Sequence, residues 1–279
     1  AYYRTTRPYD TQATTDTGDY RLITKGTSLR FGVPFTEADT VFFGVGIEQT
    51  TIESGIFLPD AYRDYARDFG ETSNTIPLTV GWSRDTRDSA LVPTRGRLQR
   101  FNTELGVAGD ARYVKANYQF QQYFALSKQY TLALNSELGF GKGLGGRPYP
   151  VFKNFFGGGL GSVRGFEQGT LGPSSPVTGS TDTVNIGGNR SIALNAEFIT
   201  PFPGAGNDRS LRMFGFVDVG NVFGDNDSRP NAKDLRASVG VGLSWISPVG
   251  PLRFAIANPI RKFTGDKIQK FQFQIGTSF

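Results

Sequence analysis

The sequence predicts an all-β protein, a transmembrane antiparallel β-barrel of about twelve strands with one long loop folded back into its interior. Three observations predict this fold class. Apolar and polar residues alternate in segment after segment, the connections between these segments alternate between short and long, and the chain is rich in glycine and aromatic residues, with 36 Gly, 24 Phe and 11 Tyr. Because successive side chains of a strand point to opposite sides, such alternation indicates a sheet whose two faces meet different environments.

Composition excludes several other classes. The mean hydropathy is -0.30, and no run approaches the roughly 18 apolar residues that a membrane-spanning helix needs. A chain of this kind would cross a bilayer as a closed sheet, since lipid cannot satisfy backbone N–H and C=O groups. The sequence has no Cys and no His, and therefore lacks thiolate ligands and the commonest general base. We expect no enzyme, no cofactor and no metal site.

The alternation is clearest near the C-terminus. Odd-numbered positions from Leu235 to Trp245 are apolar, while the even-numbered positions between them are Arg, Ser or Gly. The last segment repeats the pattern, with apolar residues at Phe271, Phe273 and Ile275 and an aromatic end at Phe279. Applied to the whole chain, the pattern predicts strands centred near residues 4, 27, 45, 79, 102, 117, 136, 195, 216, 240, 256 and 273.

The polar face of these strands decides between a membrane barrel and a soluble one. A soluble β-sandwich or lipocalin-like barrel also has alternating strands, but its interior is dry. Here the polar face carries Arg, Lys, Glu, Gln and Asn, as in the segment with Lys115, Asn117, Gln119 and Gln121. A dry core would not tolerate these groups unpaired. The sequence therefore predicts lipid outside and a wet, charged interior, with residues 1–279 forming one barrel domain.

The connections support the same architecture. Short turns are expected at residues 36–38, 127–129 and 247–250, and longer polar loops at 54–73 and 222–233. Outer-membrane barrels have short periplasmic turns and long outer loops.

One connection is much longer than the others. About 45 residues between Lys142 and Arg190 lack clear periodicity, far beyond the usual loop length. Residues 155–166 and 171–173 of this segment are apolar and rich in glycine, which suits a hairpin inserted into a barrel, where backbone passes close to backbone. A nucleotide-binding loop is disfavoured, because neither of the glycine runs, at residues 139–143 and 157–165, has the spacing of a phosphate-binding motif at the start of a helix.

The string GGGLGSVRGFEQGTLGP in this loop resembles the sixth outer loop of the BamA family of outer-membrane protein-assembly factors. Its hallmark is represented by Val163, Arg164, Gly165 and Phe166. The segments ALNAEFITPFP, FGFVDVGNVFG, SPVGPLRFAIANPI and the terminal FQFQIGTSF follow, also as in that family. The resemblance covers the chain from about residue 20 to its end.

The resemblance implies that the loop folds into the lumen, where Arg164 meets acidic residues at the positions of Glu197 and Asp218. The alternation of their strands also points both carboxylates inward. An arginine fork between two carboxylates can hold a loop in one place. Structural support of the loop and a direct mechanistic role both remain open.

The chain also departs from the family. The family barrel has sixteen strands preceded by periplasmic POTRA domains, whereas this sequence begins near the fifth strand and has no POTRA domain. The family's working seam lies between the first and last strands, so only its last-strand side, residues 267–279, can be assigned. Its seam residues are Phe271, Phe273, Ile275 and Phe279. Whether twelve strands close by themselves stays open.

The resemblance implies non-enzymatic assembly and insertion of β-barrel proteins in the bacterial outer membrane. Implied partners are unfolded β-barrel clients, outer-membrane lipid including lipopolysaccharide, and the assembly lipoproteins, which bind mainly through POTRA domains. The net charge of +5 comes from scattered basic residues, and no nucleic-acid partner is expected. The alternative is a passive outer-membrane channel or secretion pore, of the two-partner secretion or TamA kind. A hydrolase is disfavoured, because Ser162 has no His to activate it.

Overall fold

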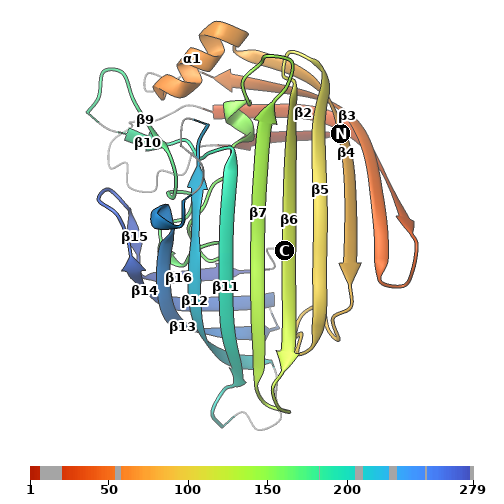
Figure 1. Ribbon diagram of the computed structural model, residues 1–279, viewed down its shortest axis with the longest axis vertical. Coiled ribbons are helices and arrows are strands. Elements are labelled where there is room, and N and C mark those ends of the chain that lie inside the picture. Colours follow the sequence, from red (N-terminus) through yellow and green to blue (C-terminus); the bar gives the residue numbers. More distant parts are fainter. Residues whose placement is uncertain are drawn as a thin grey trace.

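The computed structural model describes residues 1–6, 21–53, 58–181, 183–204, 210–225, 231–248 and 250–276 (Figure 1). Twelve strands form one curved antiparallel sheet, in the order β1-β2-β3-β4-β5-β6-β7-β11-β12-β13-β14-β16. Every expected strand is confirmed, because each predicted centre falls within one of them. Their bounds are β1 Tyr2–Thr6, β2 Arg21–Pro34, β3 Asp39–Glu53, β4 Thr72–Asp85, β5 Gly96–Gly109, β6 Tyr113–Ala125, β7 Thr131–Gly143, β11 Arg190–Pro201, β12 Leu211–Phe223, β13 Arg236–Ser247, β14 Gly250–Arg261 and β16 Phe271–Ile275.

The long segment between β7 and β11 leaves the sheet and returns to the same place. β7 pairs directly with β11, from Thr131↔Ile199 to Phe140↔Arg190, so residues 144–189 are an excursion from two neighbouring strands. This segment contains η1 Val151–Lys153, β8 Gly165–Phe166, β9 Ser174–Pro176 and β10 Thr183–Asn185. In Figure 1, β9 and β10 lie toward the same end of the sheet as the helix α1.

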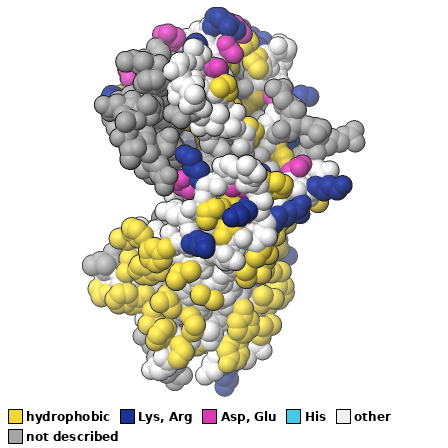
Figure 2. Space-filling view, turned by 90° about the vertical axis from the view of Figure 1, so that its left-hand side faces the viewer, with side chains coloured by type: hydrophobic (Ala, Val, Ile, Leu, Met, Phe, Trp, Pro, Cys, Tyr) yellow, Lys and Arg dark blue, Asp and Glu magenta, His cyan; other side chains and the backbone are white. Residues whose placement is uncertain are grey.

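The two faces of the sheet differ as the alternation predicts. Phe273 and Val241 are 61% and 57% exposed, whereas Gln272 and Ser238, their neighbours in sequence or on the same strand, are 4% and 0% exposed. Figure 2 shows hydrophobic side chains gathered over the lower part of the side formed by the last strands, with charged side chains above them. Phe271 and Ile275 also face outward, while Phe279 lies outside the described residues.

The connections follow the expected alternation with three exceptions. Turns of a few residues join β2 to β3, β6 to β7 and β13 to β14. At the same end, however, residues 86–95 and 202–210 form longer connections, between β4 and β5 and between β11 and β12, and at the opposite end β5 and β6 are joined by residues 110–112 alone. Loop length therefore follows the side of the barrel only on average.

The loop expected at 54–73 contains a helix that the prediction missed. The helix α1, Asp60–Phe69, places Tyr62, Tyr65, Ala66 and Phe69 on one face, with the spacing of an amphipathic helix. This face packs on Ile52 of β3, on Leu58 just before the helix, and on Val151, Val177 and Val184 of the long loop. Short helices escape detection from polarity alone, because their charged face dominates the composition.

Among the residues that the structure describes, no helix is both long and apolar enough to cross a membrane.

The outward face can be tested by placing a charge on it. Val241 lies near the middle of β13 and faces outward, so we expect Val241→Arg to destabilise the barrel in lipid by about 2–4 kcal/mol. Denaturant titration in lipid vesicles measures the difference. Gln119→Arg is the matched control, since Gln119 lies mid-strand and lines the lumen. Equal stability of the two variants would contradict a lipid-facing Val241.

Candidate functional site: a loop anchored inside the barrel

The long loop packs tightly on itself in the barrel interior. Phe155 and Gly188 exchange two backbone hydrogen bonds of 2.7 and 2.9 Å, and Gly157 forms a β-bridge with Leu171. Val163, Phe166 and Leu171 form a small cluster and are all 0% exposed. Glycine is required in this turn: Gly158 has φ +97°, and a Cβ there would lie 2.4 Å from the carbonyl oxygen of Glu167. The loop is thus a packed element, as its glycine-rich apolar sequence predicts.

Arg164 is the most enclosed charged side chain of this loop, at 2% exposed. Its Nε and Nη2 donate to Oδ2 and Oδ1 of Asp218 at 2.7 and 2.6 Å, and its Nη1 donates to Oε1 of Glu197 at 2.6 Å. Its backbone N–H also donates to Asp218 Oδ2, at 3.0 Å. The guanidinium therefore makes a two-pronged contact with one carboxylate and a single contact with another, the geometry that arginine favours.

The two carboxylates come from neighbouring strands. Asp218 on β12 pairs in register with Asn195 on β11, and Glu197 follows two residues after Asn195, on the same face. Asn195 Nδ2 joins the strands to the loop, donating to Asp218 Oδ1 at 2.9 Å and to the Ser162 carbonyl at 2.7 Å. The predicted inward direction of Glu197 and Asp218 agrees with these contacts.

Aromatic rings complete the surroundings of the guanidinium. Arg164 lies over the ring of Phe216 at 3.5 Å from the guanidinium carbon to the ring centroid. Phe216 shares the inward face of β12 with Asp218 and is 3% exposed, while Val217 between them is 45% exposed. A cation over an aromatic face gains electrostatic stabilisation, the more so where water is excluded. The Phe216 ring belongs to β12, a strand whose sequence is largely apolar on both faces.

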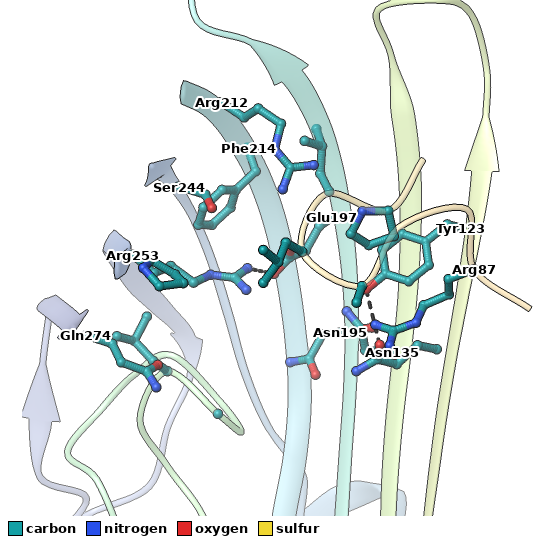
Figure 3. A pocket seen from close by; sticks show the side chains of 18 of the residues that line it. Arg87, Tyr123, Asn135, Asn195, Glu197, Arg212, Phe214, Ser244, Arg253 and Gln274 are labelled. Atoms are coloured by element: carbon teal, nitrogen blue, oxygen red, sulfur yellow. Dashed lines mark hydrogen bonds and ion pairs between the residues drawn. The ribbon is translucent and has the colours of Figure 1, made fainter. Parts of the chain in front are cut away.

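A second arginine also binds the Glu197 carboxylate. Arg253 on β14 donates from Nη2 to Glu197 Oε1 at 2.5 Å, so Arg164 and Arg253 together match the charges of Asp218 and Glu197. Figure 3 shows Arg253 pointing toward Glu197. Both residues line a luminal cavity of about 280 Å³. The connection 86–95 also lines this cavity, through Arg87 and Leu91 among others. Sequence reasoning missed Arg253, although its strand was correctly placed.

A second group of ion pairs, also missed, holds the first part of the loop. Lys153 in η1 contacts Glu48 on β3 and Glu104 on β5, each at 2.8 Å. The Lys153 carbonyl accepts hydrogen bonds from Lys115 Nζ and from the Tyr149 hydroxyl, both at 2.8 Å. Burial lowers the pKa of Lys153, but the Glu104 and Glu48 carboxylates outweigh it and raise the pKa above its ordinary value. The polar faces of the strands predicted inward carboxylates, but nothing in the sequence paired them with Lys153.

The remaining motif residues, Val163, Gly165 and Phe166, are buried beside Arg164. Phe166 and Gly165 form β8, which pairs with β15, Ile268–Gln269, just before the last strand. The predicted seam residues Phe271, Phe273 and Ile275 lie on the outer face of β16 and do not meet the motif themselves. The arrangement can position a loop through charge and hydrogen bonds. Ser162 has no histidine to activate it, since the sequence contains none.

Comparison with known proteins identifies the family. The model of the Omp85 superfamily domain matches residues 1–279. The chain belongs to the Omp85 superfamily.

Among curated relatives, the outer membrane protein assembly factor BamA of Neisseria meningitidis is 37% identical over 301 residues, which is 96% of this chain and 38% of that protein. BamA of Nitratidesulfovibrio vulgaris is 30% identical, over 94% of this chain and 32% of that protein. The human sorting and assembly machinery component 50 homolog is 28% identical over 70% of the chain. This Omp85 chain thus spans less than half the length of these curated relatives. They are named as assembly factors, not as enzymes.

Solved structures agree with the fold. BamA from Haemophilus ducreyi lacking POTRA domains 1–3 superposes with a TM-score of 0.86 at 26% identity, over 97% of this chain and 56% of that one. CdiB from Acinetobacter baumannii shares the fold alone, with a TM-score of 0.57 at 15% identity. The family and fold make this chain a β-barrel protein of the bacterial outer membrane.

The Lys153 group allows a test of the loop's first attachment. Lys153→Ala leaves Glu48 and Glu104 without their shared cation, which we expect to cost about 3 kcal/mol of local stability. Limited proteolysis should then cut near residues 147–155 much faster than in the wild type, since cleavage follows the population of the opened loop. Lys142→Ala is the control, because Lys142 is exposed on β7. Equal cleavage rates in both variants would argue against an anchoring role for Lys153.

Proposed function

We propose that this chain is the barrel part of an outer-membrane assembly factor, which inserts β-barrel proteins into the bacterial outer membrane without covalent chemistry. The observation that carries the proposal is the buried Arg164, which binds Asp218 and Glu197 and keeps the loop inside the barrel. The identity of 37% to a BamA protein over nearly the whole chain supports it. In this proposal Val163, Arg164, Gly165 and Phe166 form the loop-anchoring motif, and Glu197 and Asp218 are its acidic partners.

The proposed mechanism uses an incompletely paired strand. β16 is an edge strand of the sheet and pairs with β14 over a short stretch. Unpaired N–H and C=O groups of an edge strand are a natural template for a further strand. A client strand would add at this edge, next to Phe271, Phe273, Ile275 and Phe279, in a bilayer that the barrel thins locally. No cofactor is needed, since hydrogen bonding and burial drive insertion.

The proposed partners follow from the same reading. They are unfolded outer-membrane β-barrel clients, outer-membrane lipid including lipopolysaccharide, and the lipoproteins of the assembly complex. The BamA structure from Haemophilus ducreyi is described as lacking POTRA domains 1–3, and POTRA domains are where we expect the lipoproteins to bind. Residues 1–279 would then be the transmembrane barrel alone.

The alternative, a passive channel or secretion pore, requires an open lumen. The loop residues Val163 to Phe166 are buried inside the barrel, and the connection 86–95 lines the cavity beside them, which favours an insertase. We expect the wild-type protein in planar bilayers to show a closed or flickering conductance, because Arg164 and Lys153 hold the loop at two places. A steadily open channel would support the pore instead.

The motif can be tested through its arginine. Arg164→Ala leaves Asp218 buried without its cation, and removing one partner of a buried pair costs about 3–5 kcal/mol. We expect assembly of a reporter β-barrel in proteoliposomes to fall at least about tenfold, and Arg164→Lys to recover only part of it, because lysine cannot make the two-pronged contact.

Arg95→Ala serves as the control, since Arg95 is an exposed arginine on the connection between β4 and β5 and does not line the cavity around Arg164. Folding of each variant is checked by its heat-modifiable gel mobility, so that lost assembly is not mistaken for lost barrel. Wild-type assembly rates in a correctly folded Arg164→Ala variant would overturn the proposed role.

A further inference from the structure

The last strand is held by a short ladder. Within the described residues, β16 pairs with β14 from Leu252↔Ile275 to Ile256↔Phe271, whereas β13 pairs along nearly the whole of β14. Two further backbone hydrogen bonds extend the contact by one residue at each end, from Ala257 N–H to the Lys270 carbonyl and from Gly276 N–H to the Pro251 carbonyl, both at 2.8 Å. Residues before Lys270 leave β14 and pair with the long loop. Among the described residues, the ladder that holds β16 is therefore shorter than the one that holds β14 to β13.

The loop motif supplies a second support. In the β8–β15 pair, Phe166 lies opposite Ile268 and Gly165 opposite Gln269. The pairing continues with a hydrogen bond from the Glu167 N–H to the Lys267 carbonyl, at 3.0 Å. The motif thus pairs with the residues that lead directly into β16.

The motif backbone also lies close against β14. Gly165 has φ +89°, and a Cβ there would lie 3.1 Å from Ala257 Cβ and 3.2 Å from Pro259 Cγ. Such close approach is open to glycine and would strain other residues. Gly165 therefore brings the loop against the strand that β16 pairs with.

Gln272 joins β16 itself to the motif. Its side chain points into the barrel, is 4% exposed, and donates from Nε2 to the Phe166 carbonyl at 2.6 Å. The same carbonyl accepts from the Gly159 N–H at 3.1 Å. Within the described residues, Oε1 of Gln272 is buried without a hydrogen-bond partner. Loss of the bond to Phe166 would leave the amide nitrogen of Gln272 buried and unpaired as well, which is unfavourable.

We propose that Gln272 is a positioning residue that couples the last strand to the Arg164 motif. Arg164 is fixed on β11 and β12, the two residues after it hold β15, and the Phe166 carbonyl holds β16 through Gln272. Displacement of the loop then removes the inner support of β16 while its short ladder to β14 remains. The inference rests on the proposed function in one respect, since it is at this edge that client strands would add.

The test separates a specific bond from simple filling of space. Gln272→Met keeps a side chain of similar size but cannot donate a hydrogen bond. In the full-length protein in lipid nanodiscs, we expect amide exchange at residues 271–275 to become about fivefold faster, the effect of losing one hydrogen bond. Arg164→Lys should accelerate the same amides. Gln274→Met, two residues further along the same face, should leave them unchanged.

Unchanged exchange at β16 in Gln272→Met would overturn the proposal, as would an equal acceleration in β4 and β5, which would indicate general destabilisation. Reporter assembly is measured separately on the same samples. Failure of the wild-type protein to assemble any client would refute the proposed function but leave the exchange pattern standing. Normal assembly with unaltered exchange in Gln272→Met would refute only the coupling.

Discussion

The Arg164 guanidinium lies out of water, and its charge must be matched where it sits. Removing a charge from water costs several kcal/mol unless partners replace the lost solvation, and here Asp218, Glu197 and the Phe216 ring take that role. The partners belong to strands that are far from Arg164 in sequence. The loop can therefore adopt this conformation only when β11 and β12 are in register. The conformation of the loop thus depends on the formed sheet.

Residues on regular strands were predictable, because alternation depends on a repeat of two that the sequence displays directly. Glu197 and Asp218 could be placed on the inner face by counting from their apolar neighbours. Arg164 stood in a loop with no period, and its partners came from the resemblance alone. The contacts of Lys153 and Gln272 were not predictable, since each joins a loop to a strand more than 40 residues away, and no local pattern encodes such a pairing. The helix α1 was missed for a different reason: five of its ten residues are charged, and the composition of a loop concealed its apolar face.

The two groups of ion pairs, around Lys153 and around Arg164, attach the loop to different parts of the sheet. Lys153 connects the loop to β3 and β5, and Arg164 connects it to β11 and β12. A segment attached at both places spans the lumen from one half of the sheet to the other. Both groups keep cations and carboxylates in near balance, which suits an interior where isolated charge is costly.

The direct pairing of β7 with β11 has a consequence for how such barrels diversify. The ladder runs from Phe140↔Arg190 to Thr131↔Ile199, so β7 and β11 are joined directly whatever the excursion contains. Residues 144–189 can therefore change in length without separating β7 from β11, provided that the complementary charges on the wall and the contacts to β15 and β16 change with them. Such changes would remodel the contents of the barrel while these two strands keep their pairing.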